Sequence, residues 1–179
     1  MAGALDGMRV IDFGQYIAGP MAAMLLADQG ADVIRVDPPS GPRWDTPANV
    51  TWNRGKRSIA LDLKSDGDLD VARRLIATAD VVIENFRPGV MDRLGLGAEA
   101  TNAVNPRVIY CSMPGFAADD ARANVPAWEG VVAAATASYR GANPNAHPVY
   151  NAIPTASVYA AFQSAVGIAM ALNARDRDG

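Results

Sequence analysis

The sequence predicts an open α/β fold with a mostly parallel sheet and flanking helices. Short apolar runs alternate with helix-forming segments between Met8 and Met113, and Gly or Pro stands at many of the boundaries. Strand–helix–strand units connect parallel strands, and a regular alternation of the two elements is typical of the α/β class. A long helix of small residues is expected near the C-terminal end.

The first strand–helix–strand unit is the clearest. Residues 8–14 (MRVIDFG) form a short apolar run that ends in Gly, which predicts a strand. A helix is expected over 21–29, because Gly-Pro precedes it and Gly30 follows it. Residues 32–37 (DVIRVD) predict the second strand.

The later elements follow the same pattern, separated from the first unit by a loop from Pro38 to Gly55. Three further strands are expected within 56–64, 80–85 and 105–113. Helices are expected over 66–79, close to 97–104, over 128–139 and over 156–175.

Length and composition limit the classes of function. A chain of 179 residues suits one domain, taken as 1–179. The net charge is −3, with 16 Lys and Arg against 19 Asp and Glu, which argues against binding nucleic acid through overall positive charge. Cys111 is the only cysteine, so the sequence has no disulfide framework and no cysteine-based zinc site.

We expect a cytoplasmic protein that does not span a membrane. Residues 1–6 lack the basic start of a signal peptide, and a single cysteine fits a reducing compartment. The longest weakly polar run, Ala156 to Leu172, consists largely of Ala, Ser and Gly. This composition favours a buried helix over a membrane span.

The segment 79–97 (ADVVIENFRPGVMDRLGLG) carries most of the functional information. An apolar strand ends abruptly in Glu84, Asn85 and Phe86, and a Pro-Gly turn and a short helix with Arg93 follow. Ligands of open parallel sheets bind beyond the carboxyl ends of the strands. The segments DFGQYIAGP and VDPPSGPR follow the first two strands, so all three segments could surround one crevice suited to a phosphorylated ligand.

Glycine-based phosphate motifs are missing from the sequence. GLG at 95–97 lacks the third glycine of a dinucleotide fingerprint, and RGKRS lacks a glycine at Walker spacing. Side-chain cations would have to hold a phosphate. A cluster of cations lies between the second strand and the fourth, and either a solvated surface or an anion site explains it: Arg35, Arg43, Arg54, Lys56, Arg57 and Lys64.

Four motifs, in this order along the chain, resemble the N-terminal part of the class III CoA-transferases, the CaiB/BaiF family. They are VIDFGQYIAGPMAAMLLADQGADVIRVD, KRSIALDLK, ADVVIENFRPGVMDRLGLG and NPRVIYCSMPGF, and the resemblance extends from Leu5 to Gly179. It implies a Rossmann-like domain that continues into a second, smaller domain. It also implies an interlocked homodimer, or a companion chain that carries the second half.

The resemblance further implies that coenzyme A, as acyl-CoA, is the ligand, and that no metal is needed. Asn85 and Phe86 match positions that line the coenzyme A site, and Arg93 matches a cation near the nucleotide phosphates. Leu61 and Lys64 match positions around the adenine and its phosphates. Tyr16 and Ile17 match positions beside the acyl thioester. Such cations suit a ligand with several phosphate charges.

The family's nucleophile is an aspartate, which forms an acyl anhydride, but the matching position here is Ser157. The histidine of the family's racemases is also missing: its position falls near Trp128. Glu129 matches a position where family members often carry an acid.

Three interpretations of the missing aspartate remain open. In the first, Ser157 is a substitute nucleophile with His147 or Glu129 as its base. In the second, the chain binds acyl-CoA without catalysis, or is the inactive half of a paired protein whose other half holds the aspartate. In the third, a transferase or lyase-like reaction uses residues from a missing half or a partner chain. A purely structural role for Ser157 is a helix N-cap.

Overall fold

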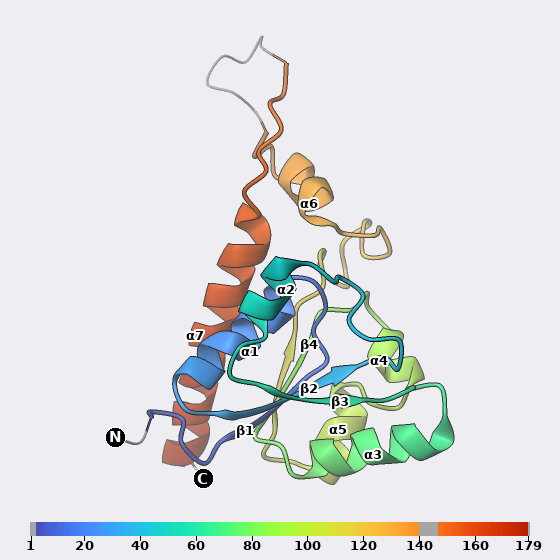
Figure 1. Ribbon diagram of the computed structural model, residues 1–179, viewed down its shortest axis with the longest axis vertical. Helices are drawn as coiled ribbons and strands as arrows, with labels where there is room; N and C mark the ends of the chain where they lie inside the picture. The colour runs from blue at the N-terminus through green and yellow to red at the C-terminus, as the bar shows by residue number, and fades with distance from the viewer. Residues whose placement is uncertain (1–2, 140–146, 179) are drawn as a thin grey trace.

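The computed structural model describes residues 3–139 and 147–178 and contains a parallel five-stranded sheet of order β3-β2-β1-β4-β5 (Figure 1). The strands are β1 (Arg9–Asp12), β2 (Asp32–Asp37), β3 (Arg57–Ala60), β4 (Val81–Glu84) and β5 (Ile109–Ser112). Every pairing in the sheet is parallel, which confirms the predicted class. The carboxyl ends of all strands therefore lie at one edge.

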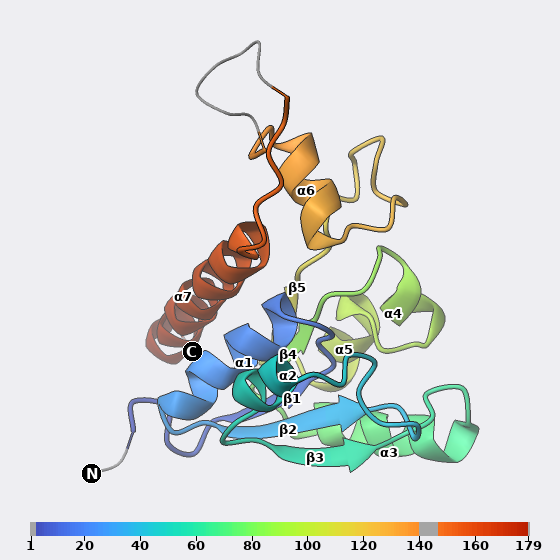
Figure 2. The ribbon, with the colours of Figure 1, turned by 45° about the horizontal axis from the view of Figure 1, so that its top comes forward.

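Helices cover both faces of the sheet (Figures 1 and 2). One face carries α1 (Ala18–Asp28), α2 (Pro47–Trp52) and α7 (Thr155–Asp178), and the other carries α3 (Asp66–Ala77), α4 (Val90–Arg93) and α5 (Ala98–Val104). The short helix α6 (Glu129–Ala135) lies beyond the carboxyl edge of the sheet. The result is a three-layer sandwich with an extension at the edge where ligands of this fold class bind.

Alternation along the strands explains the two cores. Val10 and Val33 face α1 and α7, whereas their neighbours Ile11 and Ile34 pack in the layer of α3. Because both faces of the central strands are covered, the strands are apolar almost throughout, as expected for a parallel sheet.

Helix α1 begins at Ala18 rather than at residue 21, and α6 ends at Ala135 rather than at residue 139. Two further features differ more from the sequence-based expectations. The expected loop from Pro38 to Gly55 contains a helix, α2, which begins with Pro47 at its first turn. Helix α7 exists as predicted but is not buried: only 17% of its most apolar 18-residue window is buried. Its inner residues Ala161, Ile168 and Leu172 pack in the core with α1, while much of its apolar surface remains open.

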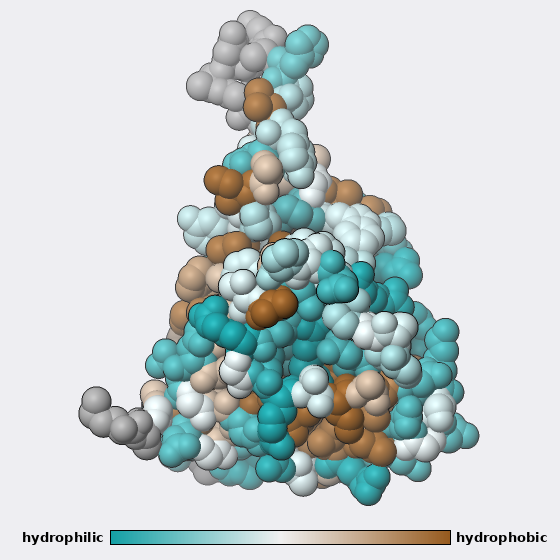
Figure 3. Space-filling model, viewed as in Figure 1, coloured by the Kyte–Doolittle hydropathy of each residue, from teal (hydrophilic) through white to brown (hydrophobic). Residues whose placement is uncertain are grey.

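The open face of α7 carries large apolar side chains along the flank of the molecule (Figure 3). The exposed residues are Tyr159, Phe162, Val166 and Met170. By length and composition α7 could cross a membrane, although helices of soluble proteins also meet this criterion.

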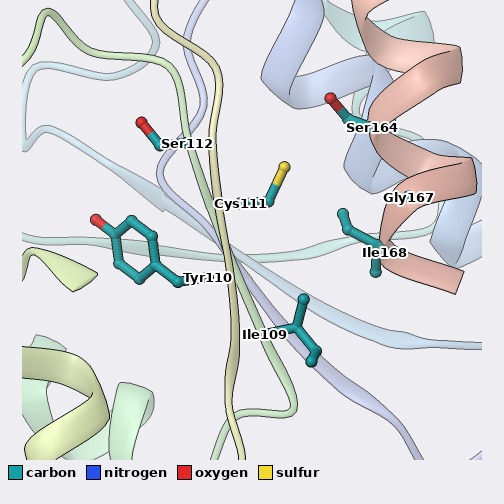
Figure 4. A pocket seen from close by; sticks show the side chains of 7 residues that line it. All are labelled: Ile109, Tyr110, Cys111, Ser112, Ser164, Gly167 and Ile168. Carbon is teal, nitrogen blue, oxygen red and sulfur yellow. The ribbon is translucent and has the colours of Figure 1, made fainter. Parts of the chain in front are cut away.

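A pocket of about 290 Å³ lies between β5 and α7. Figure 4 shows Cys111 and Ile109 of β5 directed toward Ser164 and Ile168 of α7, while Tyr110 extends toward the opposite face. Burial raises the pKa of the Cys111 thiol. The pocket therefore offers a neutral, mostly apolar lining and no cation for a phosphate.

Candidate functional site

The candidate site lies where the strand order reverses, between β1 and β4. These two strands pair at the centre of the sheet although they are far apart in the sequence. From β1 the sheet continues with β2 on one side, and from β4 it continues with β5 on the other. In open α/β sheets, ligands bind between the loops on either side of such a reversal, and we call this place at the carboxyl edge the crevice. Tyr16 and Ile17 follow β1, and Asn85 and Phe86 follow β4, so the two predicted groups flank this one crevice.

Asn85 bonds to the neighbouring loop through both polar atoms of its amide. Its Oδ1 accepts the Gln15 backbone N–H at 2.7 Å, and its Nδ2 donates to the Gln15 carbonyl at 2.9 Å. The resemblance placed Asn85 in the lining of a coenzyme A site. In the structure its side chain ties together the loops after β4 and β1, and its place in a ligand site stays a prediction.

Tyr16 is the centre of an aromatic cluster at this edge. Its ring lies 4.8 Å from that of Trp128 in an edge-on arrangement and 6.2 Å from that of Trp44, measured between centroids. The three side chains come from the β1–α1 loop, the β2–α2 loop and the segment before α6. The cluster therefore connects the loops after β1 and β2 to the segment that leads into α6.

A buried ion pair lies directly beneath the crevice. Lys56 Nζ is 2.8 Å from Asp12 Oδ2, and the two side chains are 1% and 0% exposed. The same ammonium donates to the Pro20 carbonyl and to Asn53 Oδ1, and Asp12 Oδ1 accepts the Gly14 N–H. Burial lowers the pKa of Lys56, and the Asp12 charge partly opposes that shift. The pair fixes the start of the β1–α1 loop.

The cation cluster seen in the sequence does not form one anion site. Arg35 is buried against Asp37 at 2.8 Å, and Arg57 of the edge strand β3 pairs with Asp32 of β2. With Lys56 also paired, these cations are neutralised by nearby carboxylates. Arg43 and Lys64 are exposed and have no ion pair within the described residues.

The other predicted ligand contacts differ in accessibility. Arg93 is exposed at the end of α4 and has no ion pair in the part of the chain that the structure describes, so it can reach a phosphate. Leu61 is buried in the core together with residues of α3, and Phe86 packs partly against the same cluster. Of these three residues, Arg93 is exposed, Phe86 is half-buried and Leu61 is buried.

Glu84 ends β4 inside the protein at the edge of the crevice. Its carboxylate accepts the Phe86 N–H at 2.8 Å. Burial raises the pKa of Glu84, the hydrogen bonds from Ser112 and Phe86 oppose the shift, and the charge of Asp92 adds to it. The group fixes the turn that carries Phe86.

Ser157 and Glu129, the predicted catalytic pair, are in direct contact at the start of α7. Ser157 Oγ donates to Glu129 Oε2 at 2.6 Å. Glu129 also accepts the backbone N–H groups of Ala156 and Ser157, each at 2.8 Å. The carboxylate therefore caps α7 from outside the helix.

Ser157 is not the N-cap of α7, contrary to the structural alternative considered from the sequence. The helix begins at Thr155, so Ser157 lies within its first turn, and Glu129 supplies the cap. His147 is exposed, and no hydrogen bond joins it to either residue within the described chain. Glu129 is thus the only base candidate that contacts Ser157.

Several residues of the site were not predicted from the sequence. Trp44 lacks any motif that would have drawn attention to it, and Trp128 was noted only as the place of a missing histidine. The partnership of Asp12 with Lys56 spans 44 residues. The only sequence signal for this pair was Asp12, which ends an apolar strand. An unpaired charge at such a buried position would be costly, so a partner is expected. The described residues contain no cluster of three or more potential metal ligands.

Comparison with known proteins identifies the family. The family described as CoA-transferase family III matches residues 5–179. This chain belongs to CoA-transferase family III. The resemblance drawn from the four motifs is therefore confirmed, and the chain corresponds to the N-terminal half of the family's fold. Enzymes of the family use coenzyme A thioesters as substrates.

Relatives of this family III member match nearly its whole length. It is 45% identical to the CoA-transferase/lyase DddD of Marinomonas sp. over 98% of this chain and 22% of that protein. It is 36% identical to the succinate–glutarate CoA-transferase of Agrobacterium fabrum over 98% of this chain and 48% of that protein. The chain thus spans half or less of these relatives.

Solved structures of family proteins have the same fold as this chain over about half of their own length. A CaiB/BaiF family protein from Brucella suis superposes with a TM-score of 0.93 at 34% identity, covering 100% of this chain and 51% of that one. Rv3272 from Mycobacterium tuberculosis superposes with a TM-score of 0.92 at 36% identity, covering 99% of this chain and 52% of that one.

Proposed function

We propose that this chain is the acyl-CoA-binding α/β unit of a family III CoA-transferase, a protein that moves coenzyme A between carboxylic acids. The single observation that carries the proposal is that the loops after β1 and β4 meet where the strand order reverses, and that these two loops carry four of the predicted ligand residues. The exposed cations Lys64 and Arg93 would take the phosphates, and Tyr16 and Ile17 would lie beside the thioester.

We further propose that the chain does not form the family's acyl anhydride at position 157. A serine stands there, and the nearest carboxylate, Glu129, is held by two backbone N–H groups and the Ser157 hydroxyl. A carboxylate with these donors is well placed to cap a helix, and its oxygens are partly occupied. The reacting carboxylate would then come from a second half or a companion chain, in a cytoplasmic homodimer or paired assembly.

One observation favours a second candidate, in which Ser157 itself accepts the acyl group. The 2.6 Å hydrogen bond to Glu129 has the geometry of a nucleophile and its general base. In that reaction the Ser157 oxygen attacks the thioester carbonyl, its proton passes to Glu129, and the carbon–sulfur bond breaks to release coenzyme A. The resulting ester would return its acyl group to a thiol less readily than an anhydride does.

Incubation with radiolabelled acetyl-CoA separates the two candidates. The binding proposal predicts saturable association of acetyl-CoA, and no hydroxylamine-sensitive label on the wild-type chain. Label that is present on the wild type and lost in Ser157→Ala would establish the serine ester instead. Absence of any association would contradict both candidates.

A further inference from the structure

Tyr16 has a backbone conformation that its residue type rarely adopts. Its φ is +63°, and among the described residues only Ala137 is another non-glycine with positive φ. The left-handed region brings the side chain of an L-residue too close to its own backbone, so the surroundings must hold the residue there. Strain of this kind concentrates where a binding or catalytic site needs a fixed geometry.

The contacts of Asn85 act on the peptide that determines this conformation. The Gln15 carbonyl belongs to the peptide plane that leads into Tyr16, and it accepts the Asn85 Nδ2 hydrogen bond at 2.9 Å. The Gln15 N–H is held by Asn85 Oδ1 at 2.7 Å. Because both ends of Gln15 are bonded to one rigid amide, the peptide plane before Tyr16 cannot rotate freely.

The two ends of the loop pack tightly against each other. A Cβ on Gly19 would lie 2.6 Å from the Gly14 Cα, so the two ends of the loop are in close contact. The Gly14 N–H is bonded to Asp12, which is itself held by Lys56. The loop is fixed at its base by this ion pair and at its middle by Asn85.

We propose that Asn85 is a positioning residue, whose amide holds Tyr16 in the left-handed conformation and its ring against Trp44 and Trp128. The crevice is thereby shaped on its acyl side before any ligand arrives. This inference rests on the proposed function for the identity of the ligand. The alternative is a direct role for Asn85, in which its amide would bond coenzyme A. In that case the shape of the loop would not depend on the Asn85 side chain.

The test compares Asn85→Ala and Asn85→Asp with a matched control. Asp keeps the acceptor for the Gln15 N–H but places an oxygen against the Gln15 carbonyl. Asn105→Ala is the control, because Asn105 also bonds backbone carbonyls far along the chain, those of Ile76 and Ala79, through its amide. These carbonyls lie just before β4 and therefore away from the crevice.

The first measurement is near-ultraviolet circular dichroism of the Tyr16–Trp128 contact, assigned with Tyr16→Ala and Trp128→Phe. The signal of the contact is the part of the spectrum that Tyr16→Ala and Trp128→Phe both lose. Asn85→Ala and Asn85→Asp should lose this signal as well, and Asn105→Ala should keep it. An unchanged signal in Asn85→Ala would overturn the inference. This measurement needs no ligand, so it decides the role of Asn85 even if the proposed function fails.

The second measurement is calorimetric titration with acetyl-CoA and with free coenzyme A. Loss of the positioning contact should raise the dissociation constant of acetyl-CoA about tenfold, which is the scale of one buried hydrogen-bonding interaction. The dissociation constant of free coenzyme A should change much less. Equal weakening of both ligands would overturn the inference and indicate a direct contact. A wild-type chain that binds neither ligand would count against the proposed function alone.

Discussion

Ser157 donates its hydroxyl hydrogen to Glu129 over 2.6 Å, across 28 residues of sequence. The carboxylate also holds the first free N–H groups of α7. This contact joins the first residue of α6 to α7, the longest helix in the described part of the chain. It occupies the position at which the family resemblance places an aspartate nucleophile.

Removal of the Glu129 carboxylate should destabilise the chain more than removal of the Ser157 hydroxyl. Glu129→Ala leaves two backbone N–H groups of α7 without their acceptor and should lower the free energy of unfolding by about 1–2 kcal/mol. Ser157→Ala removes one bond of three, and we expect about 0.5–1.5 kcal/mol. Urea titrations followed by far-ultraviolet circular dichroism give both values. A larger cost for Ser157→Ala would contradict the capping role of Glu129.

Restoring the family aspartate should create a conflict with Glu129. In Ser157→Asp two carboxylates share one site, and such repulsion destabilises the charged forms of both. We expect lower stability at neutral pH than in the wild type, and recovery in Ser157→Asp combined with Glu129→Gln. Thermal unfolding at pH 7 and pH 5 measures this, since protonation should relieve the single variant. Equal stability of the single and double variants at both pH values would show that the carboxylates do not interact.

The buried Asp12–Lys56 pair should be costly to break from one side. Lys56→Met leaves an uncompensated carboxylate in the interior, and we expect a loss of about 3–5 kcal/mol. The matched control is Arg54→Met, which removes an exposed pair with Asp28 and should cost less than about 1 kcal/mol. Denaturant titration distinguishes the two. Comparable small losses would mean that Asp12 finds water or another donor.

Because of Glu84, the free energy of unfolding should fall as the pH rises above the ordinary pKa of a glutamate. Burial raises the pKa of Glu84 in the folded protein above the value of 4.5 for a free glutamate. Between these two pKa values the folded state binds more protons than the unfolded state, so unfolding becomes easier with increasing pH. Glu84→Gln should remove this component. Urea titrations of both proteins from pH 4.5 upward test it, and parallel curves would contradict it.

Patterns of burial made most of the fold predictable. Both ends of β2 were predicted correctly. A strand covered on both faces is apolar, and Asp32 and Asp37 mark where this apolar run begins and ends. Helix α2 was missed, because Pro and Gly dominate its neighbourhood and only its first turn tolerates Pro47. The exposure of α7 was also missed. Its small residues resemble those of a core helix, but α1 covers only one side of it.

The site was less predictable, because long-range contacts define it. The resemblance indicated Asn85 and Tyr16 but not their relationship, which depends on a hydrogen bond pair across 70 residues. It likewise indicated Ser157 and Glu129 separately. No local pattern specifies that two such residues meet. The pairing of β1 with β4 brings Asn85 to the loop of Tyr16, and the packing of α6 against α7 brings Glu129 to Ser157.

Amide hydrogen exchange with and without acetyl-CoA tests the central claim most directly. The account predicts slower exchange at the carboxyl edge of the sheet, in residues 13–17, 61–64 and 85–93, with no change along the pocket between β5 and α7. Protection confined to that pocket, or absent everywhere at saturating acetyl-CoA, would contradict it.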